Sequence, residues 1–158
     1  MIKIESLENG KIALLTPYNP EFVTRIKATG ARWDANSKAW QIDAANIDVA
    51  RKIMREVYGQ DDQATVGDLV DVRVTIKERI IAECSPLYLF GKMVASAFSR
   101  DSGAKVAEDV CFETGMPRSA GSAKNWITVI DEGSVFTIRK VAKDMIDFNN
   151  SNYDVEVL

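Results

Sequence analysis

A short polar stretch, Gln60–Thr65 (QDDQAT), is the feature that most limits how this chain folds. Strongly patterned regions flank it on both sides, and it is the one convincing boundary in the 158 residues. We therefore predict two small domains, residues 1–59 and 66–158, joined by a linker at 60–65. A hydrophobic content of 46% is enough for a real core.

The same boundary separates two charges. Residues 1–60 carry 9 Lys and Arg against 7 Asp and Glu, whereas residues 61–158 carry 11 against 16, which gives net charges of +2 and −5. A protein that binds duplex DNA over a wide face is usually more basic than this chain. Any contact with nucleic acid should therefore be local and lie in the first region. The acidic residues from Asp61 onward are expected to form a solvated surface.

The first region begins with signals for a hairpin and a helix. Asn9-Gly10 separates two alternating runs, which predicts a hairpin with positive φ at both turn positions. Asn19-Pro20-Glu21 then predicts the start of a helix, because Asn caps, Pro suits the first turn and Glu favours the positive end of the dipole. Gly30 is expected to end that helix as a left-handed cap.

A second hairpin and helix follow. The segments 31–33 and 39–42 are predicted to be short strands around a polar turn. Apolar residues at helical spacing predict a helix from about Asn46 to Tyr58, ended by Gly59. The first domain is thus predicted to be a ββαββα module, and the whole chain belongs to the α+β class.

The second region is dominated by predicted strands. Residues 70–76 alternate apolar and polar, as a half-buried strand does. The apolar runs 87–90 and 93–98 are expected to be strands broken by a bulge at Gly91. Residues 126–130 and 135–138 flank Asp131-Glu132-Gly133 and predict a second hairpin.

The end of the second region is predicted to add a helix and a further strand. Residues 141–148 are expected to form a short C-terminal helix, and 153–157 an edge strand. We predict a mostly antiparallel β-sheet or small open barrel with a short C-terminal helix.

Cysteine and histidine usage narrows the chemistry. Cys84 and Cys111 have no CxxC spacing and are expected to be buried free thiols. Histidine is absent, which removes the commonest general base and metal ligand. We expect no catalytic residues, no metal and no cofactor. No apolar run approaches the roughly 18–20 residues that span a bilayer, and residues 1–10 lack a signal-peptide layout, so a cytoplasmic protein with no membrane contact is expected.

The first sixty residues resemble the HARP-like domain. The segments that carry the resemblance are Pro20–Phe22, Gly30–Asp34, Lys38–Ile42 and Tyr58–Gly59. That family is a small α/β module found beside annealing-helicase motors and in proteins of bacterial mobile elements. The resemblance covers roughly a third of the chain, and residues 65–158 are not assigned to a family.

The resemblance implies a role in binding branched or forked DNA. It carries over to Trp33, Asp34, Lys38 and Trp40. There is no GxxxxGK[ST] motif for a helicase motor, so only binding is implied.

The predicted hairpin around 34–38 supplies the first candidate site. Its two indoles could stack bases, but in so small a module the favoured interpretation is that both Trp33 and Trp40 are core residues. The neighbouring cations are better candidates for nucleic-acid binding, and an ordinary solvated face is the alternative. They are Arg25, Lys27, Arg32 and Lys38.

Two glycine- and serine-containing stretches are candidate partner-binding loops. Arg100 and Lys105 flank Asp101-Ser102-Gly103, which could form an anion-binding nest, although a connector with an Asx turn is the favoured interpretation. Arg118 and Lys124 lie in a stretch that resembles a phosphate loop but lacks its spacing, so we expect a loop that contacts a partner instead.

These features support two hypotheses of function. The first is a non-catalytic nucleic-acid-associated accessory protein of a phage or mobile element, which binds DNA or a nucleoprotein effector complex. The second is a protein inhibitor of a host defence system, of the anti-CRISPR or anti-restriction kind, whose acidic region complements a basic groove. A structural homo-oligomer, such as a homodimer, is a third interpretation.

Overall fold

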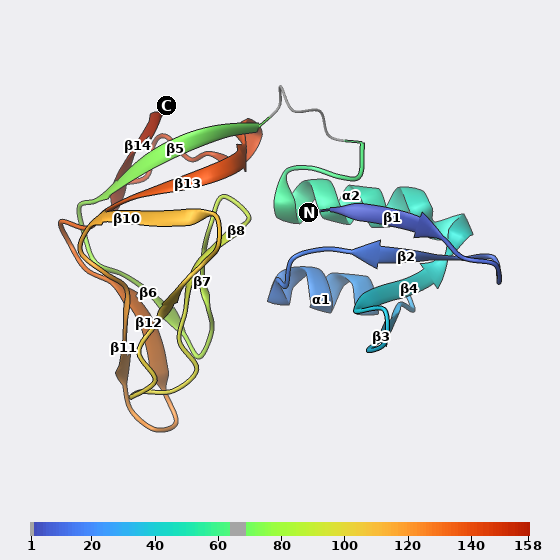
Figure 1. Ribbon diagram of the computed structural model, residues 1–158, viewed down its shortest axis with the longest axis horizontal. Coiled ribbons are helices and arrows are strands. Elements are labelled where there is room, and N and C mark those ends of the chain that lie inside the picture. The colour runs from blue at the N-terminus through green and yellow to red at the C-terminus, as the bar shows by residue number, and fades with distance from the viewer. Residues whose placement is uncertain (1, 64–68) are drawn as a thin grey trace. The chain divides into compact units, whose positions relative to one another are not determined.

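The computed structural model in Figure 1 describes residues 2–63 and 69–158. The chain divides into two compact units, Met1–Thr65 and Val66–Leu158. The α+β class is confirmed, since the described elements include two α-helices and antiparallel sheets. Residues 64 and 65 of the predicted linker and residues 66–68 of the second predicted domain lie outside the described residues.

The first unit contains one four-stranded antiparallel sheet and two α-helices. The sheet has the order β1-β2-β4-β3, which leaves β1 and β3 at its edges. The elements are β1 (Lys3–Ser6), β2 (Lys11–Leu15), α1 (Pro20–Lys27), β3 (Arg32–Asp34), β4 (Ala39–Asp43), a 3-10 helix (Ala44–Asn46) and α2 (Ile47–Tyr58).

One face of this sheet packs against both helices. Alternation along β2 and β4 turns Leu14 and Ile42 toward the helices, where they meet Phe22 of α1 and Met54 of α2 in a single core. Both helices are amphipathic, with their apolar stripes buried. The other face of the sheet carries Gln41 and other mostly polar residues.

The predicted start of α1 is confirmed. The Asn19 side-chain oxygen accepts hydrogen bonds from the backbone N–H groups of Glu21, at 2.9 Å, and Phe22, at 3.3 Å, and Pro20 is the first helical residue. The predicted left-handed cap is wrong. The helix ends at Lys27 with a right-handed Ala28, and Gly30 reaches a φ of 91° only after a further turn of chain.

The predicted second helix and first hairpin are confirmed, with one difference. α2 ends at Tyr58, and Gly59, with a φ of 74°, is its left-handed cap. In the β1–β2 connection Gly10 has a positive φ of 73° but Asn9 does not, because the backbone N–H of Leu7 bonds to Lys11 and makes a longer turn.

The acidic residues that follow α2 are not merely a solvated surface. Asp62 accepts two hydrogen bonds from the Arg51 guanidinium, at 2.9 and 3.0 Å, and Asp61 pairs with Arg55 at 2.6 Å. Side-chain exposure is 17% for Asp62 and 9% for Asp61. The expectation of free solvation is therefore wrong here, because α2 presents arginines where the chain leaves it.

The second unit contains ten strands among its described residues. They divide into three antiparallel sheets of order β10-β13-β5-β14, β11-β12-β6 and β7-β8-β9. The strands are β5 (Leu69–Ile76), β6 (Ile80–Glu83), β7 (Leu87–Leu89), β8 (Lys92–Ser96), β9 (Lys105–Val106), β10 (Val110–Thr114), β11 (Arg118–Gly121), β12 (Trp126–Ile130), β13 (Val135–Ala142) and β14 (Tyr153–Val157). One core joins them, with Val74, Val94, Ile130 and Phe136 among its members.

The predicted hairpin around Asp131-Glu132-Gly133 is wrong. The flanking strands exist, but β12 pairs with β6 and β11, whereas β13 pairs with β5 and β10. The backbone N–H of Gly133 bonds to Ile76 at 2.8 Å, so the turn is fixed to the end of β5 while the chain passes to another sheet.

The predicted bulge at Gly91 is also wrong. Phe90 and Gly91 have φ values of 54° and 75° and form a two-residue turn between β7 and β8, where Leu89 faces Lys92. This is the twist that a tight hairpin requires. The Phe90 side chain is buried in the core, which compensates for its unfavourable backbone conformation.

The predicted C-terminal helix over 141–148 is wrong as well. Val141 and Ala142 belong to β13, where they pair with Val70 and Leu69 of β5, and only a 3-10 turn at Lys143–Met145 follows. The predicted edge strand is confirmed as β14, which lies at the end of its sheet.

Two further observations concern the chain as a whole. Cys84 and Cys111 are free, as predicted, but both are exposed, so their predicted burial is wrong. In the part of the chain that the structure describes, no helix has the length and apolar character needed to cross a membrane.

Candidate nucleic-acid interface

A groove of about 830 Å³ lies where the end of α1 meets β3 and β4. It is open to solvent, and β3, which contributes to its lining, is an edge strand of the sheet. Its lining combines two indoles, two cations and a glycine-containing turn: Lys27, Gly30, Ala31, Arg32, Trp33 and Trp40.

The two indoles have different environments. Trp33 and Trp40 face each other across β3 and β4, with ring centroids 5.4 Å apart and planes tilted by 59°. Trp40 is 8% exposed and belongs to the core, whereas Trp33 is 52% exposed. The expectation that both are core residues is therefore confirmed for Trp40 and wrong for Trp33. The reason is position: β4 is an inner strand, and β3 is an edge strand with no neighbour beyond it among the described residues.

Lys27 lies at the end of α1, beside the indoles. Its Nζ atom is 5.8 Å from the centroid of the Trp40 ring, within cation–π range. The residue is exposed, and none of the ion pairs among the described residues involves it. Lys27 is thus a positive charge held beside an aromatic surface without a carboxylate to balance it.

Arg32 and Asp34 lie on the polar face of the sheet, because alternation turns them away from Trp33. Asp34 accepts hydrogen bonds from the Asn36 N–H, the Ser37 hydroxyl at 2.6 Å and the Gln41 amide. The Ser37 bond is the main reason why the pKa of Asp34 is lowered. These bonds fix the turn, and they leave Arg32 without an ion pair to any described residue.

Lys38 closes the same turn. It is exposed and has a φ of 52°, a strained value for a side chain with a Cβ. It does not line the groove, although its charge lies in the hairpin that forms it.

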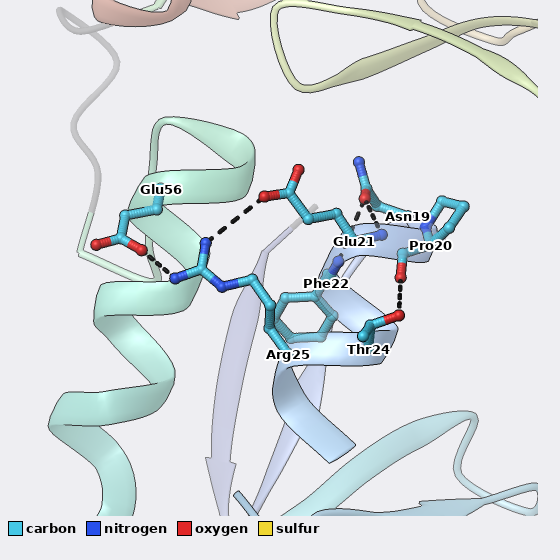
Figure 2. A network of polar contacts seen from close by, with 7 residues as sticks. All are labelled: Asn19, Pro20, Glu21, Phe22, Thr24, Arg25 and Glu56. Carbon is cyan, nitrogen blue, oxygen red and sulfur yellow. Dashed lines mark hydrogen bonds and ion pairs between the residues drawn. The ribbon is translucent and has the colours of Figure 1, made fainter. Parts of the chain in front are cut away.

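Arg25 is directed away from the groove. Figure 2 shows its guanidinium between Glu56 of α2, to which it donates a hydrogen bond, and Glu21, at 3.7 Å one helical turn earlier. The Glu56 carboxylate is the main cause that raises the pKa of Arg25, and the reverse interaction lowers the pKa of Glu56. Arg25 therefore joins α1 to α2, and its charge is balanced within the unit.

The first predicted partner loop is a connector between β8 and β9, as the favoured interpretation had it. Ser102, not Asp101, organises the turn: its hydroxyl accepts the N–H groups of Phe98 and Ser99, and Ser119 accepts the N–H of Gly103. These bonds occupy the backbone N–H groups of Phe98, Ser99 and Gly103, which therefore do not serve an anion. Arg100 pairs with Asp101 at 3.1 Å.

Lys105, at the start of β9, is exposed and in no ion pair with a described residue. The second predicted partner loop is the hairpin between β11 and β12. Arg118 binds Asp131 through two hydrogen bonds, of 2.7 and 3.0 Å, so its charge is balanced. Lys124 is exposed at the tip of the hairpin, and its carbonyl accepts from the Cys84 thiol at 3.4 Å.

The residues predicted to bind nucleic acid in the first unit thus do not all lie at the groove. Lys27, Trp33 and Trp40 meet at the groove, and Arg32 lines it from β3 with its side chain on the other face of the sheet. Arg25, Arg100 and Arg118 are bound by carboxylates. The sequence analysis did not single out Gly30 and Ala31 as groove residues, although the Gly30 turn signal places the chain reversal that shapes this end. Across residues 2–63 and 69–158, no group of three or more His, Cys, Asp or Glu could hold a metal ion.

In comparisons with known proteins, no family model, no curated protein and no solved structure matches the chain.

Proposed function

We propose that the first unit binds nucleic acid at the groove between α1 and β3, and that the chain acts as a non-catalytic accessory module. The observation that carries this proposal is the half-exposed indole of Trp33, which contacts the buried Trp40 ring at a tilt, with Lys27 placed over that second ring. An exposed indole close to a cation that pairs with no described carboxylate suits a ligand with flat bases and phosphates.

The two kinds of group contribute differently. Stacking of a base on an aromatic side chain is worth roughly 1–3 kcal/mol and tolerates any base, because every base has a π-face. Lys27, and Arg32 from the other face of the edge strand, add attraction to phosphates, which is independent of sequence and weakens with salt. The net charge of +2 in residues 1–60 fits a local contact of this kind.

The hairpin that forms the groove includes most of Gly30–Asp34 and Lys38–Ile42, two of the four segments that carry the resemblance to the HARP-like domain. If that resemblance reflects common descent, forked or branched DNA is the form of nucleic acid to test first, and a phage or mobile element is the setting in which such a module works. The nucleic acid would then be free or part of a nucleoprotein complex.

A gel-shift or anisotropy titration of the full chain tests the proposal. Single-stranded, duplex and forked DNA are compared at two salt concentrations, with wild type, Lys27→Ala/Arg32→Ala and the control Lys52→Ala. Lys52 is an exposed cation of α2 that does not line the groove. We expect binding that falls as salt rises, is lost in the double variant and is kept in the control. Absence of binding to all three forms at low salt would exclude the proposal.

The charge of the second unit supports a different candidate, an inhibitor that binds a basic groove of a defence complex. Glu78, Glu83, Glu108 and Glu132 are exposed and take part in no ion pair with a described residue. Such carboxylates could complement cations that normally hold nucleic acid. A stable complex with a purified effector nuclease, together with no affinity for DNA, would favour this candidate over the first.

A further inference from the structure

We infer that the groove selects nucleic acid with unpaired bases, a single strand or the single-stranded arm of a fork, over continuous duplex. This inference rests on the proposed function and names the form of nucleic acid that the same groove binds. Three features of the groove point to it: the exposure of Trp33, the position of β3 and the small number of cations.

Trp33 is a preformed stacking surface. Its partner Trp40 is buried and fixed in the core, and the Asp34 hydrogen bonds hold the turn that follows β3. With 52% of the residue exposed, the indole has surface available for a second flat ring. Inside a duplex both faces of each base are covered by neighbouring bases, so an indole can stack only on a base that is unpaired or at a helix end.

The position of β3 gives a strand of nucleic acid room to pass. β3 is the last strand of its sheet, and two of its residues, Arg32 and Trp33, line the groove. A flexible single strand can lay a base on Trp33 while its phosphates approach Lys27 on α1. A rigid duplex brings phosphates to the edge but no base face.

The cations of the groove are too few for a wide duplex contact. Lys27 and Arg32 line it, and Lys38 lies in the adjoining turn. Two phosphate contacts to a single strand predict a slope of about −1.4 in a plot of log affinity against log salt. Proteins that track duplex DNA over a broad face make several more contacts and show a much steeper slope.

Anisotropy with the full chain tests this inference, using labelled oligothymidylate and a blunt duplex of matched length. The variants are Trp33→Ala, Trp33→Phe and Lys27→Ala, with Lys52→Ala as the control. We expect the single strand to bind at least about tenfold more tightly than the duplex. Trp33→Ala should weaken single-strand binding by roughly tenfold to a hundredfold and leave duplex binding unchanged, while Trp33→Phe keeps part of the affinity.

Tryptophan fluorescence provides a second readout that does not depend on the alanine variant folding. Oligothymidylate should quench the wild-type emission, and Trp33→Phe should lose most of that quenching although it still binds. The inference would be overturned if single strand and duplex bound with equal affinity, if Lys27→Ala weakened both equally and if Trp33→Ala weakened neither. The proposed function would still stand. No binding of either nucleic acid at low salt would overturn both.

Discussion

Arg25 and Lys27 lie two residues apart on the same helix, yet they have opposite roles in the structure. Arg25 donates to Glu56 and lies near Glu21, so it fastens α1 to α2. Lys27 lies over the Trp40 ring, and no described carboxylate pairs with it. The comparison shows that residue type does not separate a structural cation from a ligand-binding one. What separates them is which partners the neighbouring elements supply. The two indoles of the hairpin differ in the same way, since one is buried in the core and the other is half exposed.

The largest expected effect is a loss of stability when the buried indole, Trp40, is removed, compared with removal of the half-exposed indole, Trp33. Trp40→Ala removes a buried ring from the core of the first unit and should lower its free energy of unfolding by about 3–5 kcal/mol. Trp33→Ala removes a half-exposed ring and should lower it by less than about 1 kcal/mol. Urea titrations of both variants measure the difference.

Trp126→Ala, in the second unit, serves as the control, because it should leave the unfolding transition of the first unit in place. Equal destabilisation by the Trp33 and Trp40 variants would mean that both rings are structural. Trp33 would then lose its assignment as a ligand-binding group.

The next largest effects come from the two cations of α1, one of which should affect DNA binding and the other stability. Lys27→Ala should weaken binding of single-stranded DNA of any sequence and reduce the salt slope by about 0.7, with an unchanged unfolding midpoint. Arg25→Ala should lower the unfolding midpoint, by less than Trp40→Ala does, with an unchanged salt slope.

Salt-dependent anisotropy and urea unfolding on the same protein samples measure both quantities. If the Arg25 variant lost DNA affinity to the same extent as the Lys27 variant, both cations of α1 would attract DNA whether or not a carboxylate pairs with them. The division between structural and ligand-binding charge would then have no basis.

Local signals in the sequence were enough to predict much of the first unit. The cap at Asn19, the amphipathic stripe of α2 and the stop at Gly59 depend on residues within a few positions of one another, and all are present. The candidate cations were also identifiable by type. Their partners were not, since Glu56 lies 31 residues from Arg25 in the chain.

Strand partners and exposure depend on contacts that no short window contains. The turn at 131–133 was correctly located, but which strands pair across it depends on β5 and β6. The tight turn at Phe90-Gly91 was missed because Phe occupies a left-handed position that usually belongs to Asn or Gly. The exposure of Trp33 likewise follows from the edge position of β3.

Acid should affect the structural pair more than the groove. The Arg25 hydrogen bond is the main cause that lowers the pKa of Glu56, and Arg51 does the same for Asp62. A carboxylate with a lowered folded-state pKa contributes stability above its unfolded pKa and loses it as pH falls through the folded value. The urea midpoint of the first unit should therefore decrease as pH falls below the range in which carboxylates ordinarily titrate. In the Arg25→Ala variant that decrease should be shallower.

Urea unfolding as a function of pH measures the decline, with Lys27→Ala as the matched control on the same helix. The control should retain the wild-type acid dependence, because none of the ion pairs among the described residues involves Lys27. A decline of equal steepness in wild type and in Arg25→Ala would show that the Arg25–Glu56 contact is not formed in solution.

The smallest expected effect lies in the second unit and tests whether the distinction applies beyond α1. Arg118 was a candidate binding residue, but its guanidinium is held by Asp131 through two hydrogen bonds, which are the main cause that lowers the pKa of that carboxyl. Arg118→Ala should leave DNA affinity unchanged and raise the pKa of Asp131 toward its ordinary value, as an NMR titration of the carboxyl would show. Lys124→Ala, at the tip of the same hairpin, is the control and should leave that pKa in place. A loss of DNA affinity in the Arg118 variant would show that an arginine balanced by a carboxylate can still hold the ligand, and ion pairing would then be no guide to where nucleic acid binds on this chain.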